Sequence, residues 1–121
     1  YDNFKNWADL VTVHVSVNSD VISKLSGVLL VANMSNNTFN YDEKCINMVK
    51  KYDNRIVGFV SQHRLNSNKI HMTPGISHNN GKDGDQNYRT LNNVDTDIAI
   101  VGRAIYNSDD PLDSVIKLLS E

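Results

Sequence analysis

Short apolar segments that do not alternate with polar residues constrain the fold of this chain more than any other feature. Residues 27–32 read Gly-Val-Leu-Leu-Val-Ala. Uninterrupted runs of this kind are typical of strands buried on both faces of a parallel sheet that helices cover. Four other apolar runs, rich in β-branched residues, also predict strands. These runs are residues 7–15, 56–60, 70–73 and 97–101.

Segments with helical character lie between most of these predicted strands. Residues 16–25 predict one short helix, and residues 89–95 predict another. Asn40 is predicted to cap a longer helix, because Glu43 follows it at the capping-box position. The apolar face of that helix is predicted to consist of Cys45, Met48, Val49 and Tyr52.

A final helix is predicted to begin after Asp110. Pro111 takes its first position, where a missing N–H group costs nothing. Its apolar stripe is predicted to consist of Leu112, Val115, Ile116 and Leu119. The repeated order of strand and helix predicts an α/β protein with a parallel sheet. Five strands cannot close a standard eight-stranded barrel. The chain is therefore either a small open sheet, such as a flavodoxin-like domain, or most of a barrel whose first strands lie elsewhere.

Composition, charge and the motifs that are missing argue against several classes of binding partner and cofactor. The 121 residues suffice for one small domain with its own core. The net charge of −2 gives no basic surface for nucleic acid, and no apolar run approaches the roughly 20 residues of a membrane-spanning helix. The single cysteine, Cys45, cannot form an internal disulfide and is predicted to lie in the core, which favours a reducing, cytoplasmic location. The sequence contains no zinc-type spacing of histidines and no Walker, Rossmann or GxSxG motif, so we expect neither a metal nor a cofactor.

The segment 70–103 carries the strongest candidates for a binding site. Arg103 follows a predicted strand and Gly102, so it is expected at the carboxyl end of the sheet, where ligands of α/β proteins bind. An arginine fork matches the oxygens of a phosphate group. The alternative is a surface arginine that pairs with Asp109 or Asp110.

A long polar loop, residues 77–88, precedes this arginine. Loops of about this length without secondary structure are uncommon and often act as lids or binding loops. If the segment is extended, Gln86 and Tyr88 point to the same side and both would reach one ligand. Before the loop, Thr-Pro-Gly at residues 73–75 predicts a rigid turn, in which Gly75 permits a close backbone approach.

Four segments in order resemble the orotidine 5′-monophosphate decarboxylase family. They are Ala-Asn-Met-Ser at 32–35, His-Met-Thr-Pro-Gly-Ile at 71–76, Gln-Asn-Tyr-Arg-Thr at 86–90 and Asp-Ile-Ala-Ile-Val-Gly-Arg at 97–103. The resemblance covers nearly the whole chain. It implies that residues 1–121 are the C-terminal portion of a single (β/α)8 TIM-type barrel domain and supply about five of its strand–helix units.

The resemblance also implies a reaction. Members of the family convert orotidine monophosphate to uridine monophosphate and carbon dioxide in pyrimidine biosynthesis, without a metal or organic cofactor. They usually form homodimers with active sites at the interface. The implied partners of this chain are therefore a pyrimidine nucleotide and a second copy of the protein.

Roles for individual residues follow from their positions in the matching segments. Ser35 is implied to contact the pyrimidine, and Pro74 to form the wall beside it. Residues 77–87 fall on the closing lid of the family. The phosphate is implied to lie against Gln86, Tyr88, Arg103 and the backbone of Gly102, with Gln86 also near the base.

The catalytic Lys and Asp residues of the family have no counterpart here. Their Asp-x-Lys-x-x-Asp motif is missing from the sequence, so we expect it in a preceding segment of the same chain or in a second chain. No catalytic residue is assigned within these 121 residues, which are predicted to be inactive alone. Asp85 and Ala104 also depart from the family pattern. Another sugar-phosphate barrel enzyme and a non-catalytic nucleotide-binding half-barrel remain alternatives.

Overall fold

Five parallel strands in one sheet form the centre of the molecule. The computed structural model describes residues 2–3, 5–15, 19–36, 39–65, 68–78, 81–83 and 86–120, and of residues 19, 81–83, 86 and 87 only the backbone. The strands lie side by side in the order β1-β2-β3-β4-β7, and each neighbouring pair is parallel. Their bounds are Val11–His14 (β1), Val28–Val31 (β2), Ile56–Val60 (β3), Ile70–Thr73 (β4) and Ile98–Ala99 (β7).

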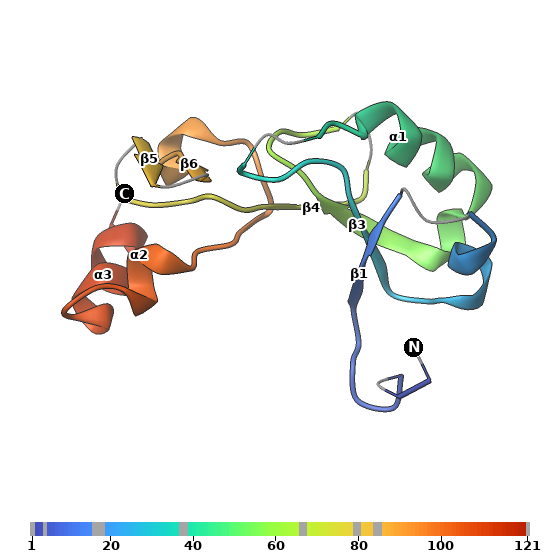
Figure 1. Ribbon diagram of the computed structural model, residues 1–121, viewed down its shortest axis with the longest axis horizontal. Helices are drawn as coiled ribbons and strands as arrows, with labels where there is room; N and C mark the ends of the chain where they lie inside the picture. The colour runs from blue at the N-terminus through green and yellow to red at the C-terminus, as the bar shows by residue number, and fades with distance from the viewer. Residues whose placement is uncertain are drawn as a thin grey trace.

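Helices and short helical turns connect these strands. The bounds of the α-helices are Asp42–Lys51 (α1), Arg103–Tyr106 (α2) and Pro111–Leu119 (α3), and those of the 3-10 turns are Ser19–Lys24 (η1), Asp53–Arg55 (η2) and Leu91–Asn93 (η3). In Figure 1, α1 lies beside β3 at one end of the molecule and α2 and α3 lie at the other. Among the described residues, no helix is long and apolar enough to cross a membrane.

The strand order distinguishes between the fold classes that the sequence left open. A flavodoxin-like sheet reverses its strand order at a switch point. Here the strands of the large sheet follow one another in sequence order across the sheet. This arrangement confirms the predicted α/β class and is consistent with part of a (β/α)8 barrel.

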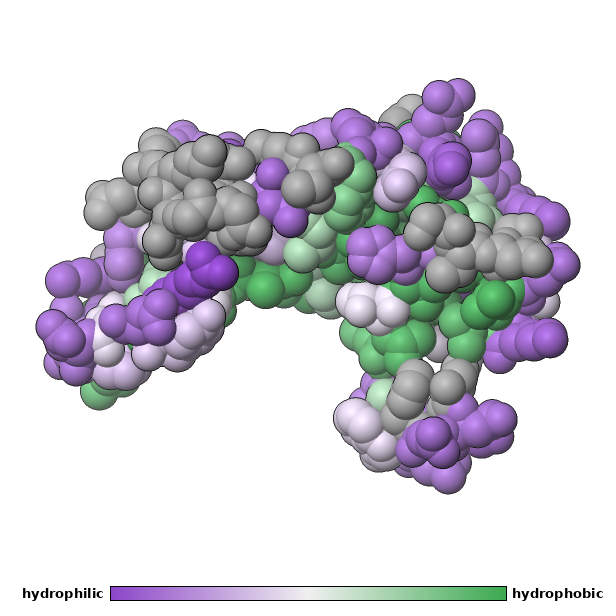
Figure 2. Space-filling view, in the orientation of Figure 1, coloured by the Kyte–Doolittle hydropathy of each residue, from purple (hydrophilic) through white to green (hydrophobic). Residues whose placement is uncertain are grey.

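The two faces of the sheet are covered unequally. All four residues of β2 are buried, as its uninterrupted apolar sequence predicts. On one face of the sheet, Leu29, Val31 and Val60 form a small buried cluster. Farther along that face, Ile70 and Ile98 are each 43% exposed. In Figure 2, apolar surface lines the hollow between the two ends of the molecule.

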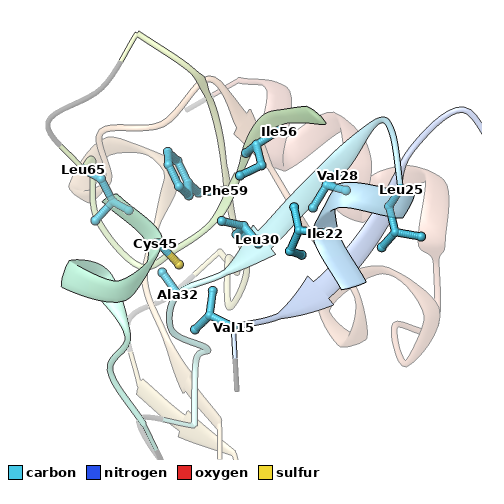
Figure 3. Close-up of a cluster of buried hydrophobic side chains, with 10 residues drawn as sticks. All are labelled: Val15, Ile22, Leu25, Val28, Leu30, Ala32, Cys45, Ile56, Phe59 and Leu65. Carbon is cyan, nitrogen blue, oxygen red and sulfur yellow. The ribbon is translucent and has the colours of Figure 1, made fainter. Parts of the chain in front are cut away.

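The opposite face carries the larger core, which Figure 3 shows around Leu30 and Phe59. Cys45 of α1 is fully buried in this cluster, as predicted. Burial raises the pKa of its thiol to about 12. The thiol is therefore neutral at physiological pH, and it packs as a small apolar group.

The sequence predicted an N-cap residue for two of the α-helices, and the structure agrees fully with one of these predictions. Asp110 caps α3, and its Oδ1 accepts a hydrogen bond from the Asp113 N–H at 3.1 Å. The N-cap of α1 is Tyr41, one residue after the predicted Asn40, but the Asn40 Oδ1 does accept the Asp42 N–H at 3.0 Å. The Tyr41 N–H donates to the Ala32 carbonyl at 2.8 Å, which holds this residue against the end of β2.

The apolar stripe predicted on α3 does not form a buried face. Leu112, Ile116 and Leu119 are 70%, 55% and 79% exposed, whereas Ser114 and Leu118 are buried. The physical reason is that α3 packs against α2, so the contacts of α2 decide which side of α3 is covered.

The predicted structureless loop contains a hairpin. Strand β5, Gly81–Asp83, pairs antiparallel with β6, Gln86–Tyr88. Pairing within the hairpin satisfies backbone groups that a loop exposes to water. The predicted helix at 89–95 is also shorter, since only the turn η3 forms. Asp85 lies outside the described residues.

Candidate functional site

A cavity of about 230 Å³ lies where β6, α2 and the segment after β4 meet. It is lined by Ile76, Tyr88, Gly102, Arg103 and Tyr106. Three of the six predicted binding residues, Tyr88, Gly102 and Arg103, thus lie together around one space. The cavity is smaller than the pockets of about 300–1,000 Å³ that enclose drug-sized ligands, so its size suits one group of a larger ligand.

The turn after β4 positions one wall of this cavity. Gly75 has a φ of 75°, in the left-handed region that favours glycine. Its carbonyl accepts the Arg89 N–H at 2.9 Å, and the Ser77 N–H donates to the Arg89 carbonyl at 2.9 Å. These two bonds flank Ile76, which is 1% exposed. The base of the hairpin is therefore fixed to the end of β4.

Arg103 occupies the first turn of α2, directly after Gly102. The side chains of Tyr106 and Tyr88 line the same cavity and lie near its guanidinium. The hydrogen bond with Tyr106 and the proximity of Tyr88 raise the pKa of the guanidinium above its already high ordinary value. The cavity therefore carries a permanent positive charge between two hydroxyl groups, an arrangement that suits a phosphate group.

The other predicted site residues lie elsewhere at the carboxyl ends of the strands. Ser35 follows β2 and is 2% exposed. Pro74 follows β4 and is buried. Neither residue lines the cavity, and strand β3 separates their parent strands. Gln86 belongs to β6, but its side chain lies outside the described part of the chain.

Gln62 joins several parts of the site, and the sequence analysis missed it. Its Nε2 donates to the Pro74 carbonyl at 3.2 Å. The Arg89 Nη2 donates to the Gln62 Oε1 at 3.0 Å and also to the Gln62 carbonyl. Burial lowers the pKa of the Arg89 guanidinium. The position of Gln62 just after a predicted strand was the signal that could have identified it.

A further hydrogen-bonded group extends this connection to β2 and α1. The Asn33 Oδ1 accepts the Gln62 N–H, and the Asn33 Nδ2 donates to the Asp42 Oδ1 at 2.6 Å. Asp42 also contacts the His63 Nε2. Side chains at the carboxyl ends of β2 and β3 are thus linked through Gln62 to Pro74 and to the base of the hairpin.

Tyr106 is the second residue that the sequence analysis missed. It lies three positions after Arg103, and residues with this spacing are neighbours on a helix surface. The signal was therefore present in the sequence. We find no group of three or more His, Cys, Asp or Glu side chains that could hold a metal ion among the described residues.

Comparisons with known proteins give this arrangement a context. The model of the family described as "Orotidine 5'-phosphate decarboxylase / HUMPS family" matches residues 1–118. The orotidine 5'-phosphate decarboxylase of Aureobasidium pullulans is 32% identical over 124 residues, which cover 86% of this chain and 46% of that protein. The uridine 5'-monophosphate synthase of Bos taurus is 33% identical, and the match covers 90% of this chain and 27% of that protein. The chain thus spans less than half the length of these relatives.

Proposed function

Because the chain belongs to the orotidine 5'-phosphate decarboxylase / HUMPS family, we propose that it forms the phosphate-gripping part of an enzyme that converts orotidine monophosphate to uridine monophosphate and carbon dioxide. The observation that carries this proposal is the cavity that brings Tyr88, Gly102 and Arg103 together. Two hydroxyl groups and a permanent cation match the terminal oxygens of a nucleotide phosphate.

The pyrimidine would lie toward the other predicted site residues. In this arrangement Ser35 contacts the base and Pro74 forms the wall beside it. The hydrogen bond from Gln62 to the Pro74 carbonyl supports this role, because it fixes the position of the wall. The hairpin β5–β6 serves as the lid, whose closure excludes water from the reacting group.

The phosphate grip contributes to catalysis from a distance. Decarboxylation breaks the bond to the carboxylate and leaves its electron pair on the pyrimidine ring, where a proton must be delivered. Binding energy gained at the phosphate can organise the distant reacting centre and lower the barrier there. The proton donor and its acidic partners are assigned to a complementary segment, because the sequence lacks the corresponding motif.

The apolar face of the sheet supports the proposal of a complementary segment. Ile70 and Ile98 are 43% exposed, and Ile100 is 39% exposed. Met72 and Ile98 are direct partners in the register of β4 and β7. Exposed sheet edges and apolar patches of this kind favour pairing with further strands. We place residues 1–121 as the C-terminal portion of one barrel domain that such strands complete.

Removal of the Arg103 side chain tests the proposed function. In the full-length protein, Arg103→Ala should weaken uridine monophosphate binding by about 100-fold, because two charge-assisted hydrogen bonds are lost. Binding of uridine, which has no phosphate, should change little. Isothermal titration calorimetry measures both affinities, and Lys50→Ala on α1 removes one positive charge far from the cavity as a control.

Other outcomes of this experiment identify the alternatives. Preference for a sugar phosphate over uridine monophosphate would favour a different phosphate-binding barrel enzyme. Equal binding by the Arg103→Ala variant and the unmodified protein would refute the assignment of the phosphate to this cavity.

A further inference from the structure

Tyr106 forms part of the cavity wall in a position that leaves its ring open to a ligand. A Cβ atom added at Gly102 would lie 3.5 Å from the Tyr106 Cε1, so the ring sits close over the backbone of Gly102. The residue as a whole is 67% exposed. The cavity is therefore bounded on this side by a tyrosine that solvent, or a ligand, can reach.

Two tyrosines from different elements flank the same guanidinium. Tyr88 comes from the hairpin strand β6 and Tyr106 from α2, and both line the cavity with Arg103. A tyrosine hydroxyl accepts hydrogen bonds and donates one, whereas a guanidinium only donates. When each hydroxyl accepts from Arg103, its own O–H remains free to donate to another group.

An anion in the cavity is the acceptor that completes this pattern. Terminal phosphate oxygens accept hydrogen bonds from a guanidinium and from hydroxyl groups at the same time. Neither a nucleoside without phosphate nor a neutral sugar hydroxyl supplies several anionic acceptors in one small volume. The pattern of donors therefore matches a phosphomonoester.

We propose that Tyr106 contacts the ligand directly, donating its O–H to a terminal phosphate oxygen as a third side-chain donor beside Arg103 and Tyr88. This inference rests on the proposed function, because it places the nucleotide phosphate in the same cavity. It makes Tyr106 a determinant of specificity for phosphomonoesters.

The variant Tyr106→Phe tests this inference, since it removes the hydroxyl group and keeps the ring over Gly102. In the full-length protein, binding of uridine monophosphate should weaken about tenfold, as expected for one hydrogen bond to a charged group. Uridine affinity should not change. Tyr52→Phe is the matched control, because Tyr52 follows α1 and packs against the larger core away from the cavity.

A second comparison separates direct contact from an effect through Arg103. In an Arg103→Ala background, measured by phosphorus NMR titration at high ligand concentration, Tyr106→Phe should still weaken uridine monophosphate binding several-fold. Loss of the effect in that background would mean that Tyr106 only positions Arg103, and would overturn the proposal.

The remaining outcomes are also decisive. Unchanged affinity in Tyr106→Phe, or equal losses for uridine and uridine monophosphate, would overturn the phosphate contact while leaving the proposed function intact. Failure of the unmodified protein to bind uridine monophosphate would instead overturn the proposed function, and with it the role of Tyr106.

Discussion

At the scale of single residues, His71 shows how burial fixes a protonation state. Its side chain is fully buried, and its Nε2 accepts the Leu65 N–H at 2.9 Å. The Nδ1 must then carry the proton that it donates to the Lys69 carbonyl, also at 2.9 Å. Burial is the main cause that lowers the pKa of His71, and the nearby Arg64 lowers it further. His71 is therefore a structural histidine, which fixes the segment before β4 to Leu65.

The lowered pKa predicts a specific dependence of stability on pH. Unfolding restores the ordinary histidine pKa of about 6.5, so the unfolded chain binds a proton more readily than the folded chain. The free energy of unfolding should therefore be at its full value above that pKa and should fall as the pH drops below it. Urea unfolding between pH 5 and 8 measures this trend. His71→Gln should flatten it, whereas His14→Gln, at an exposed position, should retain it. Equal slopes for His71→Gln and the unmodified chain would contradict the prediction.

At the scale of elements, the hairpin β5–β6 is fixed to the rest of the molecule at its base. The backbone bonds of Arg89 and the hydrogen bonds of its guanidinium to Gln62 meet at this base. Gln62 also donates to the Pro74 carbonyl, so one side chain couples the base of the hairpin to the residue that follows β4. The first residues after β6 are therefore held to the segment that follows β4.

Loss of the Gln62 side chain should loosen this root. Each of its two side-chain hydrogen bonds contributes about 1 kcal/mol, so Gln62→Ala should speed amide exchange of Ser77 and Arg89 by up to about thirtyfold. Gln62→Glu keeps an acceptor for Arg89 and should show a smaller increase. Ser23→Ala removes an exposed side-chain hydrogen bond in η1, far from the hairpin in sequence, and is the control: it should leave the exchange of Ser77 and Arg89 unchanged. Exchange rates that are unchanged in Gln62→Ala would show that the backbone bonds suffice.

The elements that sequence reasoning predicted correctly are those with a strong local cause. Uninterrupted apolar residues specify β2, and Asp110 followed by Pro111 specifies the start of α3. The hairpin was missed because its strands are short and polar, so no apolar period marks them. The roles of Gln62 and Tyr106 depend on which segments meet in space, and a sequence read residue by residue does not contain that information.

At the scale of the whole molecule, the open sheet predicts the behaviour of the isolated chain. Residues 1–121 alone should not decarboxylate orotidine monophosphate, because the chain lacks the Lys and Asp motif. The exposed isoleucines of the sheet should also bind a hydrophobic dye. The fall in substrate absorbance measures decarboxylation, and the fluorescence of the bound dye measures the exposed apolar surface. A full-length family member is the reference for both measurements. Turnover by a verified pure preparation of the chain would refute the first expectation.

The burial of Cys45 has a practical consequence for studying this fold. Its thiol lies between α1 and the sheet, is neutral at physiological pH and is the only sulfhydryl in the sequence. An alkylating reagent reacts with the exposed thiolate, so modification requires α1 to lift from the strands beneath it. The rate of labelling therefore reports the free energy of that local opening. A single native side chain can serve as a probe of how firmly the helix is held, without any engineered label.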